Sequence, residues 1–400
     1  MGVAVIHPRS AWGARKPKRV YRISLPTPKL YLHHSAGSGA NESAVKAIQK
    51  YHMDVKGWSD IAYCVDEKTE ILTDRGWLHV DDLQVGDLAL TLNPETFLGE
   101  WQPVEAVNRF EALSRGRRML KSESTSHSSL TTQEHRWLTD NRLHGRGVRR
   151  SARLTENDVI LAAAPSADLP QEQKWTDDFV ALVGWFWTEG HIRPFDEVEI
   201  TQSHTVNGDH CLDIERRLRA VFGDPVESLR GQSGPAWRIS DGANNRRFYL
   251  NGEAGRILLE VAPNRVLTPE FITQLTEAQL RLLLDISVKG DGWCRPGGSW
   301  SISQRKREQL DAFQMVPQLL GISTVLRYDK RLDMWVLAAY KNPNRRPAKG
   351  AEWVTYYGRV WCPTTANGSW LARRDGKPFF TGNSFLIDND APDIDIFEGR

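Results

Sequence analysis

A cysteine, an asparagine and a serine mark the two ends of one long internal segment of this 400-residue chain. Cys64 follows the run Gly-Trp-Ser-Asp-Ile-Ala-Tyr, and Asn383 is followed directly by Ser384. The Cys64 thiol can attack the carbonyl of Tyr63 and give a thioester, because a thiolate is a strong nucleophile. Ser384 can then take the acyl group, and Asn383 can cyclise onto its own carbonyl. These side chains have the types needed to break two peptide bonds and make one.

The sequences on either side of this segment read as one continuous run. If residues 64–383 are removed, the flanks join as Gly-Trp-Ser-Asp-Ile-Ala-Tyr-Ser-Phe-Leu-Ile-Asp. A plain insertion into another protein would not need a nucleophile at one end and an asparagine at the other. The segment therefore resembles an intein, a protein that cuts itself out and ligates its flanks.

The resemblance extends to motifs inside the segment. Residues 66–87 are similar to an intein N-terminal block, and residues 358–383 are similar to the C-terminal blocks. The run Thr-Thr-Gln-Glu-His that ends at His135 resembles the Thr-x-x-His element of the intein splicing (Hint) domain. The resemblance implies that His135 protonates the departing Cys64 nitrogen and that Thr132 hydrogen-bonds nearby.

Two positions depart from the usual intein pattern. Gly382 stands where most inteins carry a histidine that helps the asparagine to cyclise, so another group must assist. Cys362, with Trp137 and Thr381, resembles the Trp-Cys-Thr signature of a class in which the upstream flank moves directly onto the internal cysteine. Inteins of that class usually lack a first-position nucleophile, whereas this chain has Cys64. Either cysteine could make the first attack, and Cys362 could also be a small buried apolar residue.

A weak internal repeat occupies the middle of the segment, and each copy predicts a helix with an acidic end, a strand ending in glutamine, and a second helix. The runs at residues 182–190 and 284–292 resemble the two helices of LAGLIDADG homing endonucleases, which pack along a pseudo-two-fold axis. The resemblance implies that Glu189 and Asp291 meet at the centre of double-stranded DNA and bind Mg²⁺. The metal would activate water and stabilise the leaving oxygen.

Individual positions fit this nuclease resemblance unevenly. Gly184 allows close helix packing, whereas Ile286 at the matching position does not, and Lys289 is unusual in such a helix. The family's basic catalytic residue should fall where this chain has Arg265 but no lysine. The expected DNA-contacting residues are the base readers Gln202 and Gln304 and the basic residues Arg305 and Lys306.

The joined flanks resemble the zinc N-acetylmuramoyl-L-alanine amidase domain of peptidoglycan recognition proteins and phage endolysins. In Tyr-Leu-His-His-Ser-Ala, the first zinc ligand maps to His33, with His34 as the second choice. Tyr63 matches the tyrosine near the metal. The other zinc ligands of the family would lie beyond Arg400, so we expect no amidase activity from this chain. Zn²⁺ and peptidoglycan would then belong to the complete host protein.

The overall composition places few limits on these interpretations. A hydrophobic share of 40%, a charged share of 26% and a net charge of +2 are ordinary for globular chains. Basic runs such as residues 305–307 suit phosphate backbones, or are simply solvated surface. Four widely spaced cysteines without a Cys-x-x-Cys pair disfavour a disulfide framework. No apolar run approaches the roughly 18 residues of a membrane span, and His7, Pro8 and Arg9 interrupt any signal sequence.

We therefore predict a multidomain chain: an all-β Hint (horseshoe) domain interrupted by an α+β LAGLIDADG endonuclease domain, with fragments of an α/β amidase at both ends. The predicted boundaries are residues 1–63 and 384–400 for the flanks, 64–168 and 346–383 for the Hint domain, and 169–345 for the endonuclease. We expect linkers at 165–173 and 342–350, helices at 42–52, 209–222 and 306–320, and a strand at 30–33. We also expect a monomer that splices in the cytoplasm, with the mature amidase acting at the cell wall.

Two other interpretations remain open from the sequence. A peptidoglycan amidase or binding protein with a non-splicing accessory insertion would not need Cys64, Asn383 or Ser384. A DNA-binding or DNA-cleaving protein that does not splice would leave the continuity of the two flanks unexplained.

Overall fold

The computed structural model describes residues 64–141 and 143–382. Five candidate residues lie outside this part of the chain: His33, His34, Tyr63, Asn383 and Ser384. The strand predicted at 30–33 and the helix predicted at 42–52 also lie outside it. Within the described ranges, no helix is long and apolar enough to cross a membrane.

Strands from the beginning and the end of the described chain pair with one another and form three antiparallel sheets, which we call the split β unit. The first part contributes β1 (Val65–Asp66), β2 (Glu70–Thr73), β3 (Gly76–Leu78), β4 (Leu88–Leu92), β5 (Gly99–Pro103), β6 (Ala106–Phe110), β7 (Arg117–Glu123), β8 (Ser128–Thr132), β9 (Arg136–Asn141), β10 (Gly145–Arg150) and β11 (Asp158–Leu161). The second part contributes β20 (Asn344–Arg345), β21 (Glu352–Tyr356), β22 (Val360–Thr364), β23 (Ser369–Arg374) and β24 (Lys377–Gly382).

The strand orders of these sheets are β21-β7-β8-β1-β22-β6, β10-β9-β11-β20 and β24-β23-β2-β4-β5, with β3 paired to β2. The short strand β1 lies between β8 and β22, where Val65 is opposite Thr131 on one side and Trp361 on the other. This register places the preceding residue, Cys64, deep in the sheet rather than on an edge. Most of the indole and phenyl groups beneath the sheets are fully buried, including Trp137, Trp361, Trp370 and Phe379.

The residues between the two parts form the inserted α/β unit, which repeats one arrangement twice. The first copy contains α2 (Asp177–Glu189), β12 (Gly190–Ile192), β13 (Val198–Ser203), α3 (Gly208–Phe222), β14 (Trp237–Asp241) and β15 (Asn245–Leu250). After α4 (Gly252–Val261) and α5 (Pro269–Thr273), the second contains α6 (Glu277–Asp291), β16 (Gly292–Cys294), β17 (Trp300–Gln304), α7 (Arg307–Phe313), α8 (Met315–Leu319), β18 (Ser323–Asp329) and β19 (Met334–Tyr340). Short 3₁₀ turns occur at Ser151–Arg153, Pro194–Asp196 and Pro263–Arg265.

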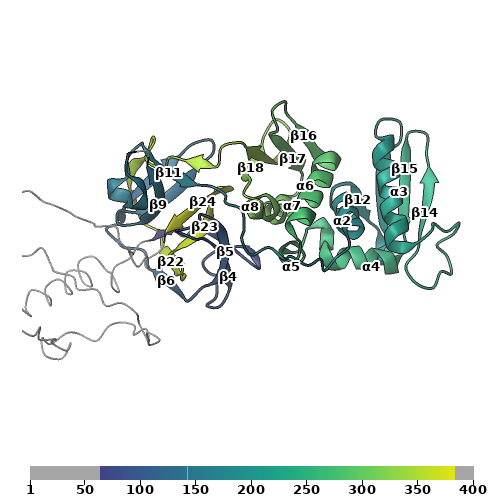
Figure 1. Ribbon diagram of the computed structural model, residues 1–400, viewed down its shortest axis with the longest axis horizontal. Coiled ribbons are helices and arrows are strands. Elements are labelled where there is room, and N and C mark those ends of the chain that lie inside the picture. Colours follow the sequence, from purple (N-terminus) through teal and green to yellow (C-terminus); the bar gives the residue numbers. More distant parts are fainter. Residues whose placement is uncertain (1–63, 142, 383–400) are drawn as a thin grey trace, which may run out of the picture.

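The two four-stranded sheets of the α/β unit have equivalent strand orders, β12-β13-β15-β14 and β16-β17-β19-β18. In Figure 1, α2 and α6 lie in the middle of this unit, with the split β unit beyond the α6 side and α3, β14 and β15 at the far end. Both α2 and α6 run directly into a short strand, so their last residues, Glu189 and Asp291, lie where a helix meets a sheet.

Complementary side-chain sizes hold α2 and α6 together. A Cβ on Gly184 would lie 2.8 Å from Cγ2 of Ile286, so the bulk of Ile286 is accommodated by the missing side chain opposite it. One turn later the sizes are reversed, and a Cβ on Gly290 would lie 2.5 Å from Oγ1 of Thr188. Ile286 therefore does not prevent the close packing that the sequence led us to question.

Two expected elements differ from the structure. The helix predicted at 306–320 is divided into α7 and α8. Pro317 has no N–H to give to the preceding turn, so the helix cannot continue unbroken. The linker predicted at 342–350 contains β20, which pairs with β11 and carries a buried arginine, Arg345. The Arg345 guanidinium donates to the carbonyls of Ser126 and Asn342, and these bonds compensate its burial.

A buried arginine joins the two units. Arg373 on β23 is 1% exposed and pairs with Glu70 on β2 through two hydrogen bonds of 2.7 and 2.6 Å. Its remaining nitrogen donates to Asp311 on α7, at 2.6 Å, and to Gln314, at 2.9 Å. The Gln314 amide then donates to the carbonyl of Gly376 in the β23–β24 turn, at 3.2 Å. The hairpin that leads to Thr381 is thus packed against the α/β unit.

Candidate active sites

Cys64 and Cys362 lie face to face in the split β unit. They follow the register in which Val65 is opposite Trp361, and their sulfur atoms are 3.9 Å apart. Both side chains are fully buried. Burial, together with the neighbouring Cys362, raises the pKa of Cys64 well above its usual range. Cys64 is therefore a thiol at neutral pH, and an attack by it requires a proton acceptor.

The backbone of Cys64 is held by Thr132. The Cys64 amide donates to the Thr132 hydroxyl at 3.0 Å, and the Thr132 amide donates to the Cys64 carbonyl at 2.9 Å. The sequence suggested that Thr132 would hydrogen-bond near the amide between Tyr63 and Cys64, and its hydroxyl lies on the nitrogen of that amide. The Cys64 nitrogen must gain a proton when this amide is broken, and the Thr132 hydroxyl oxygen lies beside that nitrogen.

His135 lies on the other side of Thr132 and contacts Thr381. Its Nε2 atom is 2.5 Å from the Thr381 hydroxyl, and its ring meets the edge of Trp137 with 5.1 Å between ring centroids. The structure thus brings together Trp137, His135 and Thr381, and the expected proton transfer from His135 to the Cys64 nitrogen stays a prediction.

Two neighbouring polar residues were missed by the sequence analysis. Ser151 accepts from the Trp137 indole at 2.9 Å and also contacts the Thr131 hydroxyl at 2.9 Å, which fixes the indole. Asn108 on β6 is opposite Cys362, and its amide nitrogen lies 3.9 Å from the Cys362 sulfur. Nothing in the local sequence marks Asn108, because its role depends on the pairing of β6 with β22.

The structure gives a reason for glycine at position 382. A Cβ there would lie 2.7 Å from the main-chain oxygen of Arg136, at the start of β9. Backbone atoms cannot move aside as a side chain can, so any larger residue would force β24 away from β9. A histidine at this position is incompatible with the observed strand packing.

Glu189 and Asp291 occupy equivalent positions at the ends of α2 and α6. The Gln202 amide donates to Glu189 at 3.1 Å, and the Gln304 amide donates to Asp291 at 2.5 Å. Burial, then the charge of Asp291, raises the pKa of Glu189 to about 7. Burial likewise raises the pKa of Asp291. The two carboxylates are close enough to repel one another, which is the arrangement expected of groups that share a cation.

The same contacts revise the expected role of the two glutamines. Gln202 and Gln304 are buried, with 6% and 7% of their surfaces exposed, and their amide nitrogens face the carboxylates. They therefore orient the acidic pair and do not present donors to DNA bases in this structure. Arg305 and Lys306, which follow β17, are exposed and can reach phosphates.

Arg265 lies under the same pair of acidic residues. Its guanidinium donates to the carbonyls of Trp187, at 2.8 and 3.1 Å, and of Thr188, at the end of α2. Both carboxylates favour its charge, although burial lowers the pKa of Arg265. The guanidinium is thus a fixed positive charge that also caps α2. The unexpected Lys289 is explained by an ion pair with Asp285, 2.7 Å away on the surface of α6.

The acidic pair fits a hard divalent cation. Glu189 and Asp291 supply two oxygen donors from partly buried carboxylates, and Mg²⁺ is commonly held by one or two carboxylates together with waters and substrate phosphates. No group of three or more histidine, cysteine or acidic residues suited to a metal occurs in the described part of the chain. A cation held by this pair would therefore need further ligands from solvent or from a bound molecule.

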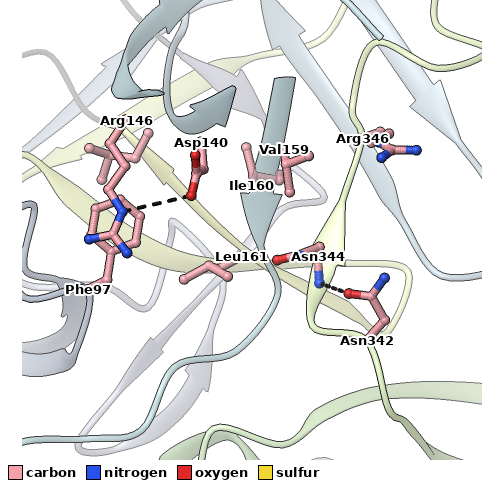
Figure 2. A pocket seen from close by; sticks show the side chains of 10 residues that line it. Phe97, Asp140, Arg146, Val159, Ile160, Leu161, Asn342, Asn344 and Arg346 are labelled. Atoms are coloured by element: carbon pink, nitrogen blue, oxygen red, sulfur yellow. Dashed lines mark hydrogen bonds and ion pairs between the residues drawn. The ribbon is translucent and has the colours of Figure 1, made fainter. Parts of the chain in front are cut away.

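A surface pocket of about 500 Å³ lies apart from both clusters. Figure 2 shows Arg146 over the ring of Phe97, with 3.9 Å from the guanidinium carbon to the ring centroid, and paired with Asp140 at 3.8 Å. Asn342 and Asn344 close its other side. None of the residues expected to do chemistry lines it, so it is not the centre of either site.

Comparison with known proteins gives partial matches. No family model matches the chain. The human N-acetylmuramoyl-L-alanine amidase is 33% identical over 90 residues, which cover 19% of this chain and 15% of that protein. Mouse peptidoglycan recognition protein 1 is 33% identical over 79 residues, which cover 18% of this chain and 43% of that protein. The chain thus matches less than half of the length of these curated relatives.

Comparison with solved structures also gives partial matches. The homing endonuclease I-DmoI in complex with DNA and Mn matches 41% of this chain and 89% of its own, with 11% identity and a TM-score of 0.30. The DnaX mini intein from Spirulina platensis matches 26% of this chain and 70% of its own, with 27% identity and a TM-score of 0.21. The bacterial intein-like domain from Clostridium thermocellum matches 24% of this chain and 65% of its own, with 22% identity and a TM-score of 0.21.

Proposed function

We propose that residues 64–383 form an intein that excises itself and joins Tyr63 to Ser384. One observation carries this proposal: residues from both ends of the segment meet at the same short stretch of chain. The Cys64 amide is hydrogen-bonded to Thr132, and Gly382 packs against Arg136, which lies four residues after Thr132. A protein that must cut at two distant junctions needs them at one site, and His135 lies between these two contacts.

The proposed reaction uses side chains of this chain alone. A nucleophilic cysteine attacks the carbonyl carbon of Tyr63, and the Cys64 nitrogen leaves with a proton, for which Thr132 and His135 are the nearby polar groups. The acyl group passes to the Ser384 hydroxyl. The side-chain nitrogen of Asn383 then attacks its own main-chain carbonyl and breaks the bond to Ser384. Finally, the freed amine of Ser384 takes the acyl group from its own oxygen and forms an amide.

Intact mass after expression of the full chain tests this proposal. Splicing predicts two products, one with the mass of residues 64–383 less one water, because Asn383 has cyclised, and one with the mass of the ligated flanks. Asn383→Ala should stop release of the downstream flank, while Cys211→Ala, a buried cysteine far from the junction on α3, should splice normally. A chain that stays whole under all conditions would refute the proposal.

We propose, second, that the α/β unit is a LAGLIDADG endonuclease that cuts double-stranded DNA. The observation that favours it is the matched pair of carboxylates, each with its own glutamine. Glu189 and Asp291 would hold Mg²⁺, which supplies a Lewis acid for the phosphate and an activated water. Arg265 supplies a fixed positive charge beside them, and Arg305 and Lys306 would contact the backbone.

The DNA target of such an enzyme can be argued from the joined flanks. The enzyme would destroy its own gene unless the insertion interrupts the site, so the expected target is the uninterrupted coding sequence across Tyr63 and Ser384. A linear fragment with this sequence should be cut in Mg²⁺, and the interrupted gene should not. Asp291→Asn should abolish cutting, whereas Asp285→Asn, on the exposed face of the same helix, should not.

We propose that the spliced flanks belong to a zinc N-acetylmuramoyl-L-alanine amidase that acts on peptidoglycan. The named relatives support this, since they are amidases and peptidoglycan recognition proteins over about 19% of the chain. His33 would be a zinc ligand of that host protein. Splicing in the cytoplasm as a monomer, followed by action at the cell wall, completes the proposal. Zinc content and peptidoglycan hydrolysis of the full-length spliced host, with and without His33→Ala, would test it.

A further inference from the structure

Cys64 and Cys362 lie close enough for both to take part in the reaction, one after the other. An initial attack by Cys64 would leave the upstream flank attached to its own sulfur, and the Cys362 sulfur lies 3.9 Å from that atom. Cys64 directly precedes β1, and the register that pairs Val65 with Trp361 sets it opposite Cys362 on β22, so strand pairing next to Cys64 limits the separation. A thioester carbon on Cys64 is bonded to the sulfur and therefore falls within reach of Cys362.

We propose that Cys64 and Cys362 act in sequence, as an acyl relay that hands the upstream flank from the first sulfur to the second before it reaches Ser384. The inference rests on the proposed splicing function and specifies its first steps. The Cys362 thiolate attacks the thioester carbon and forms a new carbon–sulfur bond. The bond to Cys64 breaks, and Cys64 leaves as a thiolate that takes up the proton given up by Cys362. The step exchanges one thioester for another and needs no oxidant, reductant or metal.

The relay removes the acyl group from the amine that could reverse the first step. In a thioester on Cys64, the free α-amino group of the same residue can attack the carbonyl and restore the amide, which is the more stable bond. Transfer to Cys362 moves the acyl group to the neighbouring strand, away from that amine. The intermediate then survives long enough for Ser384 to attack.

Asn108 is placed to support the second sulfur. Its amide nitrogen lies 3.9 Å from the Cys362 sulfur, and it also donates to the Cys362 carbonyl at 3.4 Å and to the Thr364 hydroxyl at 3.2 Å. An N–H directed at sulfur stabilises the thiolate that makes the transfer. We assign Asn108 as a positioning residue for this step.

The test uses the full chain with Asn383→Ala and Ser384→Ala, so that acylation stops at the cysteines. While residues 1–63 are still attached, only an acyl group on Cys362 leaves Cys64 with both its amine and its thiol free. 2-Cyanobenzothiazole reacts with that pair, and it is added before any thiol so that released chains are not labelled. We expect labelling at Cys64 together with release of residues 1–63 by added thiol. Labelling absent while thiol releases residues 1–63 would overturn the relay, and this measurement keeps both cysteines native.

Alanine variants of the otherwise natural chain separate the relay from the two simpler routes. Cys64→Ala and Cys362→Ala should each abolish ligation, with melting curves compared with that of Cys211→Ala. Ligation in Cys64→Ala would mean that Cys362 attacks directly, and ligation in Cys362→Ala would mean that Cys64 passes the flank straight to Ser384; either overturns the relay. Asn108→Ala should slow the appearance of label about tenfold, without slowing thiol release in the Cys362→Ala chain. A natural chain that never splices would refute the proposed function instead.

Discussion

Gln202 donates a hydrogen bond to Glu189, the residue 13 positions before it, and Gln304 makes the same bond to Asp291 at the same spacing. The two halves of the α/β unit therefore repeat this glutamine–carboxylate contact as well as the order of helices and strands. Each amide satisfies one oxygen of a carboxylate that burial has made costly to ionise. The other carboxylate oxygens are available to a cation. Without one, the two negative charges repel each other, and the effect of this repulsion on stability can be measured.

Replacement of Glu189 by glutamine should stabilise the protein at high pH. The pKa of Glu189 is about 7 in the folded state, against an ordinary 4.5, so the folded protein holds a proton that the unfolded chain loses between these values. This carboxyl therefore lowers stability progressively as the pH rises from about 4.5 to 7. In EDTA at pH 8, Glu189→Gln should raise the melting temperature by about 2–4 °C. Near pH 4.5 the gain should vanish. The exposed Glu260→Gln should show no such pH dependence.

Loss of the Arg265 guanidinium should destabilise the α/β unit. Arg265→Ala removes the donors to the carbonyls of Trp187 and Thr188 and leaves Glu189 and Asp291 without their nearest fixed positive charge. We expect a loss of about 1–3 kcal/mol in the free energy of unfolding, measured with urea. Arg281→Ala, which breaks only an exposed pair with Glu277, should cost about 0.5 kcal/mol or less. Equal effects of the two would contradict the capping role.

A methyl group at position 382 should impair splicing more than it impairs folding. Gly382→Ala sets a Cβ 2.7 Å from the Arg136 carbonyl, so β24 must move and Thr381 must shift from His135. We expect a decrease in splicing of about tenfold or more, because misplacement of about 1 Å at a reacting group costs up to about a hundredfold. Gly147→Ala, where a Cβ meets nothing within 4 Å, is the matched control. Normal splicing of Gly382→Ala would show that this contact is not needed.

Mild oxidation should join Cys64 to Cys362 and stop splicing. Their sulfurs are 3.9 Å apart on paired strands, so a small movement brings them to bonding distance. Treatment of the Asn383→Ala chain with diamide should remove two hydrogens from the mass and block thiol-induced release of residues 1–63 until a phosphine reductant is added. Peptide mapping should find the link between these two cysteines. A link that involves Cys211 or Cys294 instead would contradict the geometry.

Local sequence patterns predicted some elements well and others poorly. The apolar runs before Glu189 and Asp291 lie in α2 and α6. The first helix is buried along most of its length and is apolar nearly throughout, whereas the second has apolar residues on its buried side and an exposed charged face. Residues 74 and 75 form the turn between β2 and β3, and the glycine that follows, Gly76, has a φ of 97° that suits this residue type. Both features depend on residues close together in the chain, so they can be predicted from the local sequence.

Features that depend on distant parts of the chain were not visible. The division between α7 and α8 involves Pro317, but its position is also set by Gln314, whose amide reaches Gly376, 62 residues away. The contact of Asn108 with Cys362 spans 254 residues and exists only because β6 pairs with β22. Gln202 and Gln304 were expected to read DNA bases because of the resemblance of their strands to those of the nuclease family. Their burial and their bonds to Glu189 and Asp291 depend on the fold and could not be read from the sequence.

Arg373 has a consequence for any attempt to shorten this protein. A compact version made by deleting residues 169–345 would lose Asp311 and Gln314 and leave Arg373 with one carboxylate, that of Glu70, near a newly opened surface. The inserted α/β unit thus shares a buried hydrogen-bond network with the split β unit, so it cannot be deleted without a cost to that unit. A working miniature would need the charge rebuilt, for instance with an aspartate in the new linker, or removed by making both Arg373 and Glu70 apolar.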